Sequence, residues 1–366
     1  MLKTCSYSSI FVPFEIKLLH ESQSGFRHQH SCQTALTDLI DRWLTCMDDG
    51  NLIGTIVLDL KKVFDTVDHF MLCRKLHYYK ISRQPVTWFK SYLSSRTQKI
   101  GIGNNISNHE PVKQGMPQGS ILGHFLFILF INDLPLENIK CNIDMYADDT
   151  TLQCHSNRKS EIERSLNEDL NTINNWCIQN NMLINPTKTT CMFIGTAQRI
   201  ATVTNELNIN LENQFIKNVN TKKLLGIYIL GIYIDNNLDW KEQVDHICKN
   251  INSRLFLLSK IKIYLDKKSR ILFFNSYILP IFDYCSNVWG NLNDEGIQRI
   301  TQLQKRAARI ILDAPFLTPT RELFENLNWL SFCDRISYNK LVLVYKILHD
   351  KTPNYLKKLC IPSSSY

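Results

Sequence analysis

Two adjacent carboxylates, Asp148 and Asp149, follow Tyr146-Ala147 between two apolar runs, and no other feature constrains the fold as strongly. The pattern predicts a β-hairpin with the acids at its tip, where they repel each other and neither can enter an apolar core without a partner. A bound divalent cation removes that conflict and would mark a Mg²⁺ site for phosphoryl chemistry. Asp-Asp is also ordinary turn chemistry, so the dipeptide alone leaves both interpretations open.

A third carboxylate decides between these interpretations. Asp59 ends the run Leu52–Leu58, whose β-branched and aliphatic residues predict a buried strand. If that strand pairs with the strand predicted over Cys141–Tyr146, Asp59 and Asp148 face each other across the ladder. Three carboxylates then surround a space suited to two hard cations, which can activate an attacking hydroxyl and stabilise the leaving oxygen. The three acids therefore indicate nucleotidyl transfer.

The composition permits a nucleic-acid partner without identifying one. The 366 residues, of which 44% are hydrophobic and 10% aromatic, suffice for two globular domains. A formal charge of +8 suits a polyanion, although many unrelated proteins are mildly basic. The twelve cysteines include no Cys-x-x-Cys pair, which favours free thiols over a zinc site or a disulfide framework.

The sequence carries no secretory signal and no membrane span. Its longest apolar stretch, Ile121–Ile131, contains Gly123 and His124 and is too short to cross a bilayer. We therefore expect an intracellular, soluble protein with no membrane partner. The basic residues are dispersed, so they indicate neither a nuclear nor a cytoplasmic address.

The periodicity of the N-terminal half predicts alternating strands and helices. A helix is expected over Val67–Tyr79, with Asp65 or Thr66 as its cap. A polar, loop-like stretch, Ser94–Glu110, comes next. After a further tight loop, Ser120 can cap an apolar helix.

Two segments after the hairpin complete the order β-α-β-β-α-β. Apolar residues at helical spacing predict an amphipathic helix, namely Ile162, Leu166, Leu170, Ile173 and Trp176. Thr190–Ile194 supplies the last strand. The fold class is therefore α+β, with helices on one face of a small antiparallel sheet.

From about Asp235 the chain becomes predominantly helical, so we expect two domains, 1–234 and 235–366. One helix is predicted from an apolar stripe of Ile247, Ile251, Leu255 and Leu258. A second is predicted from about Gly296 to Leu312 and carries three basic residues, Lys305, Arg306 and Arg309. These form either a solvated basic face or a face that follows a phosphate backbone.

A short tandem repeat lies just before this boundary. The segment Leu225–Ile229 is followed at once by an identical copy, Leu230–Ile234. Because an odd insertion reverses the faces of a strand, we expect a bulge, a longer strand or a local defect here.

In their order along the chain, these segments resemble the motifs of reverse transcriptases from non-LTR retrotransposons, especially the jockey-like group. The matching segments are Gln23–Arg27 for the fingers motif, Leu58–Asp65 for motif A, Gly115–Gly123 for motif B, Tyr146–Asp149 for motif C, Leu183–Thr189 for motif D, Leu224–Gly226 for the primer grip and Leu303–Asp313 for a thumb-side helix. The resemblance implies a right-hand polymerase with partial fingers, a βαββαβ palm and a helical thumb.

The same resemblance implies an RNA-directed DNA polymerase, which adds dNTPs to the 3′-hydroxyl of a DNA primer on an RNA template. Asp59, Asp148 and Asp149, with the backbone carbonyl of Leu60, would hold two Mg²⁺ ions, or Mn²⁺ in their place. Lys188 would protonate the departing pyrophosphate as general acid.

Further residues would contact the substrates. Arg27 would neutralise the incoming triphosphate, and the ring of Phe64 would exclude a ribose 2′-hydroxyl. Gln118 and Gly119 would approach the template–nucleotide pair. The nucleic acid would be held by primer-grip and thumb-side residues, namely Leu225, Gly226, Lys305, Arg306 and Arg309.

Departures from the family motifs favour a second interpretation, a catalytically impaired nucleic-acid-binding remnant. Only a short segment precedes the fingers motif, so we expect N-terminally truncated fingers, and no endonuclease or RNase H signature is visible. Lys61 and His124 replace a small residue and a proline of the motifs, and the duplication falls on the primer grip. A third interpretation, a viral RNA-dependent RNA polymerase, is disfavoured by Phe64.

Overall fold

The computed structural model describes residues 18–117, 119–203, 206–219, 221–224 and 231–360. The chain divides into two compact units, each continuous in space and discontinuous in sequence. The first unit comprises Met1–Ser31 and Cys46–Val219, and the second comprises Cys32–Thr45 and Asn220–Tyr366. Helices and strands both contribute to the described residues, so the α+β class is confirmed.

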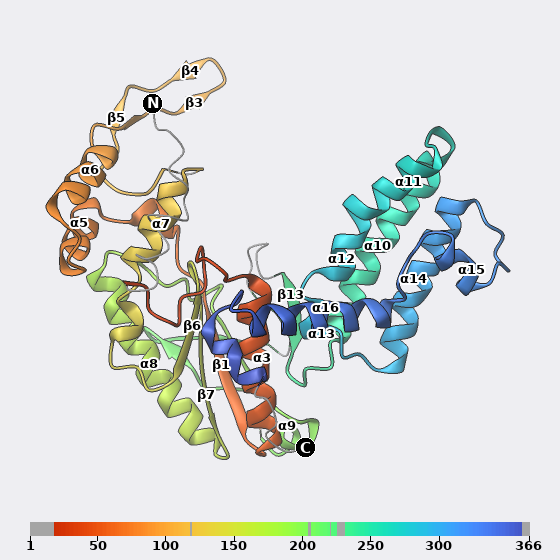
Figure 1. The fold of residues 1–366 in the computed structure, drawn as a ribbon. Coiled ribbons are helices and arrows are strands. Elements are labelled where there is room, and N and C mark those ends of the chain that lie inside the picture. Colours follow the sequence, from red (N-terminus) through yellow and green to blue (C-terminus); the bar gives the residue numbers. More distant parts are fainter. Residues whose placement is uncertain (1–17, 118, 204–205, 220, 225–230, 361–366) are drawn as a thin grey trace. The chain divides into compact units, whose positions relative to one another are not determined.

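The first unit is built on a five-stranded sheet with the strand order β11-β8-β1-β7-β6 (Figure 1). Its strands are β1 (Leu52–Leu58), β6 (Asn142–Tyr146), β7 (Asp149–Ser156), β8 (Thr190–Ile194) and β11 (Lys217–Asn218). Every neighbouring pair is antiparallel except β11 with β8, and β11 is a strand that the sequence pattern did not predict. The central strand β1 is buried along its whole length.

The predicted pairing of the first strand is wrong. We expected β1 to lie next to the strand that precedes the acidic turn, but β1 pairs with β7, the strand that follows it. β6 is instead the edge strand of the sheet. Its residues alternate between buried and exposed or half-buried, as an edge strand with one solvated face should, whereas β7 is buried at Thr150, Thr151, Leu152 and Gln153.

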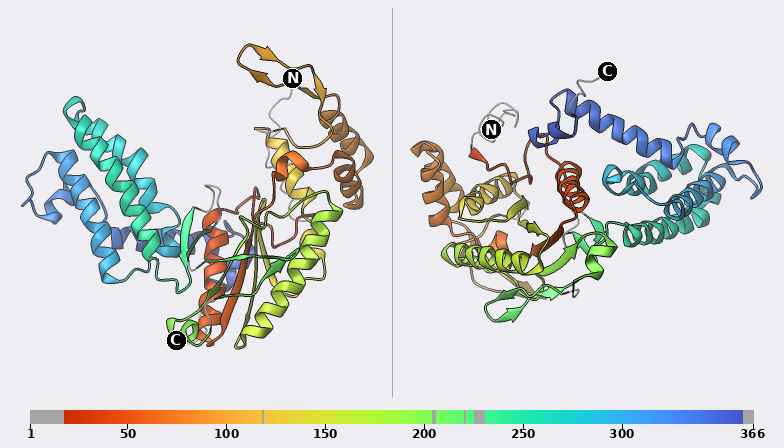
Figure 2. Two further views of the ribbon diagram at one scale, coloured as in Figure 1. Left: turned by 180° about the vertical axis from the view of Figure 1, so that it is seen from behind. Right: turned by 90° about the horizontal axis from the view of Figure 1, so that it is seen from below.

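Helix α8 (Lys159–Gln179) packs along one face of the sheet against β1 and β7, as Figure 1 and Figure 2 show. All the apolar residues that predicted this helix are buried. Gly54 in β1 allows the close approach, because a Cβ there would lie 2.2 Å from Ile162 Cγ2 and 2.9 Å from Leu166 Cδ1. The helix thus closes the core of the first unit over the sheet.

The other helices of the first unit are α4 (Val63–Thr66), α5 (His69–Tyr78), α6 (Arg83–Leu93), α7 (Ile121–Phe130) and α9 (Ala197–Ala201), with a 3₁₀ turn, η1 (Leu134–Leu136). The predicted helix start at Val67 is wrong. α5 begins two residues later, because Asp68 caps it by accepting a hydrogen bond from the Met71 N–H at 2.8 Å. The cap of α7 is Ser120, as predicted.

We expected a polar loop over Ser94–Glu110, but this stretch forms short strands. It contains the small strands β2 (Thr97–Gln98), β3 (Gly101–Ile102) and β4 (Asn105–Ile106), and it ends in β5 (Glu110–Pro111). β2 pairs with β5 and β3 with β4. The resulting ribbon projects from the α5–α7 region of the first unit (Figure 1). A further small hairpin joins β9 (Asn210–Leu211) to β10 (Gln214–Phe215).

The second unit is predominantly helical. It contains most of α3 (Cys32–Asp48) and a two-stranded ribbon of β12 (Thr221–Leu224) and β13 (Ile232–Asp235). Its remaining helices are α10 (Lys241–Ile261), α11 (Lys267–Phe273), α12 (Leu279–Asp283), α13 (Ser286–Trp289), α14 (Asp294–Leu312), α15 (Thr320–Glu325) and α16 (Phe332–Leu348), with the short helices η2 (Lys262–Tyr264), η3 (Phe274–Ile278) and η4 (Asn354–Cys360). The predicted apolar stripe of α10 is buried in full.

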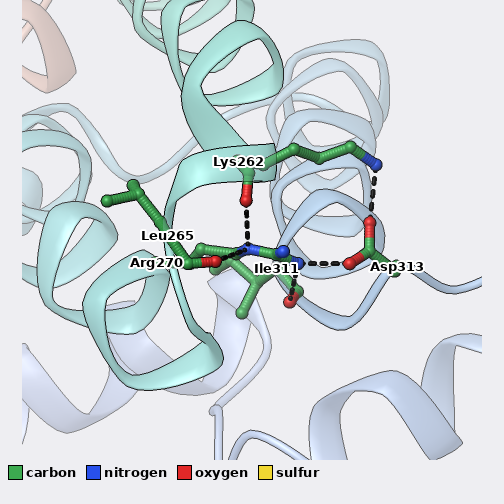
Figure 3. A network of polar contacts seen from close by, with 5 residues as sticks. All are labelled: Lys262, Leu265, Arg270, Ile311 and Asp313. Carbon is green, nitrogen blue, oxygen red and sulfur yellow. Dashed lines mark hydrogen bonds and ion pairs between the residues drawn. The ribbon is translucent and has the colours of Figure 1, made fainter.

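The ends of three helices in this unit meet at the side chain of Arg270 (Figure 3). Its Nε donates hydrogen bonds to the carbonyls of Lys262 and Leu265, at 3.1 and 3.0 Å. Its Nη1 donates to the carbonyl of Ile311 at 3.2 Å and to the carboxylate of Asp313. Helix ends leave carbonyls without helical partners, and this one guanidinium satisfies carbonyls from α10, η2 and α14.

The described cysteines are all free thiols, as the spacing of cysteines predicted. Among the described residues, no helix has the length and apolar composition needed to cross a membrane.

Candidate active site

The acidic pair lies at the tip of the β6–β7 hairpin, as predicted. Tyr146, the last residue of β6, pairs with Asp149, the first residue of β7, so Ala147 and Asp148 form a two-residue turn. Ala147 adopts a left-handed φ of 58°, which tight hairpin turns require. Asp148 is therefore part of the turn, and Asp149 begins a strand in the interior of the sheet.

Asp59 lies beside this tip. It directly follows β1, whose last residue, Leu58, pairs with Thr150 of β7. The next position along the ladder brings Asp59 to the level of Asp149, because antiparallel strands run in opposite directions. The corrected strand pairing thus places Asp59 close to both residues of the acidic pair, Asp148 and Asp149.

Burial and neighbouring carboxyl charges raise the pKa values of Asp148 and Asp149. Burial raises the pKa of Asp148, and the charge of Asp59 adds to the rise, while a backbone hydrogen bond and His124 oppose it. Burial also raises the pKa of Asp149 to about 8, with further contributions from the charges of Asp148 and Asp59. The fold therefore concentrates negative charge at the hairpin tip at a cost in electrostatic energy.

The chemistry of this donor set fits divalent cations such as Mg²⁺ or Mn²⁺, which prefer carboxylate oxygens. Among the described residues, no three Asp, Glu, His or Cys side chains already converge as a closed metal site requires. That arrangement is compatible with Mg²⁺, which proteins usually bind through one or two carboxylates together with substrate phosphates rather than in a complete protein cage.

Leu60, the residue after Asp59, takes part in a bridge that does not use its backbone carbonyl. Leu60 forms an isolated antiparallel bridge with Ile184, which brings the loop 183–189 alongside Asp59. The hydrogen bonds of this bridge are made by the neighbouring residues at 2.8 and 2.7 Å, and neither uses the Leu60 carbonyl. Lys188 is an exposed residue of the same loop.

Arg27 lies in a segment that pairs with the hairpin. Residues 22–24 make two backbone hydrogen bonds of 2.8 Å with Met145 of β6. The Arg27 Nη1 donates to the carbonyls of His20 and Gln23, at 2.9 and 2.8 Å. These bonds hold the half-buried Arg27 side chain against the segment that flanks the acidic turn.

Phe64 joins the segment after Asp59 to helix α7. Its half-buried ring packs against His124 and Phe127, with ring centroids 5.5 and 4.5 Å apart. The carbonyl of Phe64 accepts a hydrogen bond from the Met116 N–H at 2.6 Å. The Phe64 ring is therefore held in one place by the helix that follows the tight loop.

Gly119 lies in that loop and is exposed. Its φ of 77° favours glycine, whereas a Cβ there would meet nothing within 4 Å, so backbone conformation rather than crowding explains the residue. The next residue, Ser120, caps α7 and lies 2.5 Å from the hydroxyl of Tyr92 through its Oγ. The loop is thus anchored at the start of α7, and Tyr92 is a contact that the sequence did not reveal.

Three predicted positions, Gln118, Leu225 and Gly226, lie outside the described residues, as does most of the tandem repeat. The remaining predicted positions are in the second unit, on α14. Lys305 is half-buried there, and the exposed Arg306 donates to Asn252 Oδ1 on α10 at 2.9 Å.

Arg309, the third basic residue of α14, is half-buried, and its guanidinium carbon lies 5.3 Å from the ring centroid of Phe316. Arg306 and Arg309 are therefore both engaged within the second unit.

Side chains that the sequence reasoning did not single out also contact the acidic segments directly. They are Gln23, which bonds to Ala147, and Asn185 and Thr189, which bond to Asp59. The only available signal was their place inside the matched segments Gln23–Arg27 and Leu183–Thr189.

Comparison with known proteins agrees with these motifs. Residues 6–234 match the family model described as reverse transcriptase (RNA-dependent DNA polymerase). The chain is 29% identical to the probable RNA-directed DNA polymerase from transposon BS of Drosophila melanogaster, over 88% of this chain and 36% of that protein. It is 26% identical to the RNA-directed DNA polymerase from mobile element jockey of the same species, over 85% of this chain and 34% of that protein.

The chain thus spans about a third of the length of these curated relatives. Among solved structures, a telomerase from Candida albicans in complex with a fragment of telomeric RNA aligns with 88% of this chain and 57% of its own, at 11% identity and a TM-score of 0.49.

Proposed function

The chain belongs to the reverse transcriptase family, and on that basis we propose that it is an RNA-directed DNA polymerase of the non-LTR retrotransposon type. The reaction is the attack of a primer 3′-hydroxyl on the α-phosphate of a dNTP, directed by an RNA template. The observation that carries the proposal is the juxtaposition of Asp59 with Asp148 and Asp149 at one end of the sheet, in a chain of this family.

In this proposal Asp59, Asp148 and Asp149 hold two divalent cations, Mg²⁺ or Mn²⁺, together with the carbonyl of Leu60. When bound, such ions activate the attacking hydroxyl and stabilise the leaving oxygen. The carboxylates must be ionised to act as ligands, and the cations favour that ionised state over the neutral state which burial favours. The carbonyl of Leu60 supports the assignment because the adjacent bridge leaves it unused.

The nucleotide is oriented by residues around the acids. Arg27 binds the triphosphate, and Lys188 donates a proton to the departing pyrophosphate from the loop that bridges to Leu60. Phe64, fixed against α7, excludes a ribose 2′-hydroxyl. The proposal also retains Gln118 and the adjacent Gly119 as contacts to the template–nucleotide pair.

The wider architecture proposed is a right hand. Residues 1–234 form partial fingers and a palm, which contains the five-stranded sheet and α8, and residues 235–366 form a helical thumb and C-terminal region. Leu225, Gly226 and the basic residues of α14 bind the RNA template and DNA primer. The overall positive charge and the helical character of the C-terminal part support this assignment.

Primer extension tests the proposal. The purified chain, given an RNA template annealed to a DNA primer, dNTPs and Mg²⁺, should extend the primer, and Asp148→Asn should reduce extension to background. Asp144→Asn is the matched control. Asp144 is a half-buried carboxylate of the same hairpin that accepts a hydrogen bond from Gln153, and it is not a proposed cation ligand, so extension should continue.

The same assay identifies the second candidate, a nucleic-acid-binding remnant. If the wild-type chain binds the template–primer but extends it no more than Asp148→Asn in Mg²⁺ or Mn²⁺, the polymerase proposal is wrong.

A further inference from the structure

The side chain of Gln23 is completely buried and bonds to both polar groups of the residue before Asp148. Its Oε1 accepts hydrogen bonds from the N–H groups of Ala147 and Gly25, at 2.9 and 2.7 Å. Its Nε2 donates to the carbonyl of Ala147 at 3.3 Å. The Gln23 amide therefore forms hydrogen bonds with both the N–H and the C=O of Ala147, a turn residue that is not paired in a strand.

The contact is close because of the residues on either side. Gly25 has no side chain, and a Cβ there would lie 2.2 Å from the Ala147 nitrogen and 2.9 Å from the carbonyl carbon of Tyr146. Ala147 holds a left-handed φ that L-residues disfavour, so the turn needs outside support to keep its shape. Gln23 supplies that support, and the direction in which Asp148 leaves the turn depends on it.

Asn185 makes the corresponding contact on the other side of the acids. Its Nδ2 donates to Asp59 Oδ2 at 3.0 Å, and its backbone N–H donates to the Asp59 carbonyl at 2.7 Å. Thr187 Oγ1 donates to Asn185 Oδ1 at 2.8 Å, which directs the NH₂ group of the amide toward Asp59. Thr189 completes the arrangement, because its Oγ1 accepts a bond from the Asp59 N–H at 3.2 Å.

Both contacts come from neutral amides. A lysine or arginine in either place would offset the charge of the acids and compete with a cation for their oxygens. An amide fixes position and leaves the negative charge for a cation. Hydrogen-bonding partners behind the ligands of a metal site commonly set ligand orientation and metal affinity in this way.

We propose that Gln23 and Asn185 are positioning residues that hold Asp148 and Asp59 at the separation needed for divalent cations to bind between them. The proposal deepens the polymerase function proposed above and rests on it for its biological meaning. Its measurable consequence, cation affinity, does not require turnover.

Mn²⁺ binding measured by electron paramagnetic resonance, in the absence of nucleotide and primer, tests the proposal. Gln23→Met keeps the volume of the side chain and removes its hydrogen bonds to the turn, and Asn185→Ala removes the bond to Asp59. Each should weaken Mn²⁺ binding by about 10- to 100-fold, the usual range for such partners of metal ligands. The same variants should need correspondingly more Mg²⁺ for half-maximal primer extension.

Matched controls separate positioning from general damage to the fold. Gln153→Met changes another buried glutamine of the same sheet, and Asn218→Ala changes a half-buried asparagine that bonds to Leu207. Both should bind Mn²⁺ within about twofold of the wild type. If Gln23→Met fails to fold by circular dichroism, Asn185→Ala, a half-buried loop residue, decides the question alone.

The outcomes are distinct from those of the polymerase test. Wild-type Mn²⁺ affinity in folded Gln23→Met and Asn185→Ala overturns the positioning proposal, as does a wild-type chain that binds no Mn²⁺. A wild-type chain that binds Mn²⁺ but incorporates no dNTP contradicts the polymerase proposal. The Mn²⁺ affinities of the variants still test the positioning proposal in that case.

Discussion

At the residue scale, Asp149 is the group for which ionisation and folding conflict most plainly. Its carboxyl is largely buried beside two others, and its pKa rises from the ordinary 3.8 to about 8. Between these values the folded chain keeps a proton that the unfolded chain has released. The stability that protonation provides is therefore fully present below the unfolded pKa and is lost as the pH rises toward 8.

The conflict predicts a pH-dependent stability. Without metal, the free energy of unfolding should fall between about pH 4 and about pH 8, by at most about 1.4 kcal/mol per pH unit from this residue. Asp149→Asn should show a shallower fall, because it has no proton to lose. Urea unfolding in a chelating buffer across this range measures both slopes. Equal slopes in the two proteins would rule out Asp149 as the cause.

Millimolar Mg²⁺ supplies a second arm of the same experiment. A cation favours the ionised carboxylates, so the wild-type slope should flatten when Mg²⁺ is added. In Asp149→Asn the effect of Mg²⁺ should be smaller. An equal response in both proteins would place the cation elsewhere.

The acids could be predicted from the sequence, whereas the residues that hold them could not. Adjacent carboxylates between apolar runs are visible in a short window. Gln23 and Ala147 are 124 positions apart, and Asn185 and Asp59 are 126 apart, so no local spacing connects them. Periodicity predicts which face of an element is buried, and it carries no record of such long-range polar pairs.

At the scale of elements, prediction succeeded where the hydrophobic period was strong. β1 and β8 have the bounds that their apolar runs predicted, and α8 buries the whole predicted stripe. The small strands between Thr97 and Pro111 were missed because each has two residues and all are exposed, which leaves no alternation to read.

The strand pairing was missed for a different reason. The hairpin has two arms, and the sequence reasoning considered only the arm that ends at Tyr146 as the partner of β1. The actual partner, β7, buries polar side chains at Thr150, Thr151 and Gln153. Polar side chains can lie in the interior of a sheet, as Gln153 does with its bond to Asp144, so hydrophobicity alone does not identify the central strand.

The junction around Arg270 predicts a large effect from one side chain of the second unit. Arg270→Met removes the donor shared by three helix-end carbonyls and the ion pair to Asp313. The change should destabilise the second unit by about 1–3 kcal/mol, because carbonyls with little access to water lose their partner. Urea unfolding followed by tryptophan fluorescence measures the loss.

Arg321→Met is the matched control for this junction. Arg321 pairs with Glu325 one turn away, and its side chain is 89% exposed. Exposed pairs of this kind contribute little, so its effect should stay within about 0.5 kcal/mol. A loss of stability as large as that of Arg270→Met would contradict the role of the junction.

At the scale of the whole molecule, α3 joins sequence-distant parts of the chain. Most of this helix belongs to the second unit, although the residues on either side of it belong to the first. Asp38 of α3 forms an ion pair with Lys358 at 2.9 Å. The buried apolar residues of α3, Leu36, Leu39, Ile40 and Trp43, are absent from the core cluster of the first unit as far as the described residues define it. Sequence reasoning divided the chain between residues 234 and 235, and it did not predict that α3 belongs to the unit of the C-terminal helices.

A shortened chain tests whether α3 needs the rest of the second unit to cover its apolar side chains. A fragment that ends at Val219 retains α3 without most of the second unit, so apolar side chains such as Leu39 and Trp43 would face water. We expect the fragment to bind a hydrophobic dye and to associate, whereas the full chain does neither. Size-exclusion chromatography and dye fluorescence measure both. Replacing Leu39 and Trp43 with Gln should lower dye binding by the fragment, and a monomeric, dye-free fragment would contradict the expectation.

The position of α3 also sets an order in time. Synthesis proceeds from the N-terminus, so α3 leaves the ribosome long before Asn220 and everything after it. At ordinary rates of translation the interval is on the order of ten seconds or more. During that interval the helix exists without the residues it will pack against, and chaperones have time to bind its apolar face. Thus α3 is made before the sheet of the first unit, yet it reaches its final surroundings only after the second unit has been made.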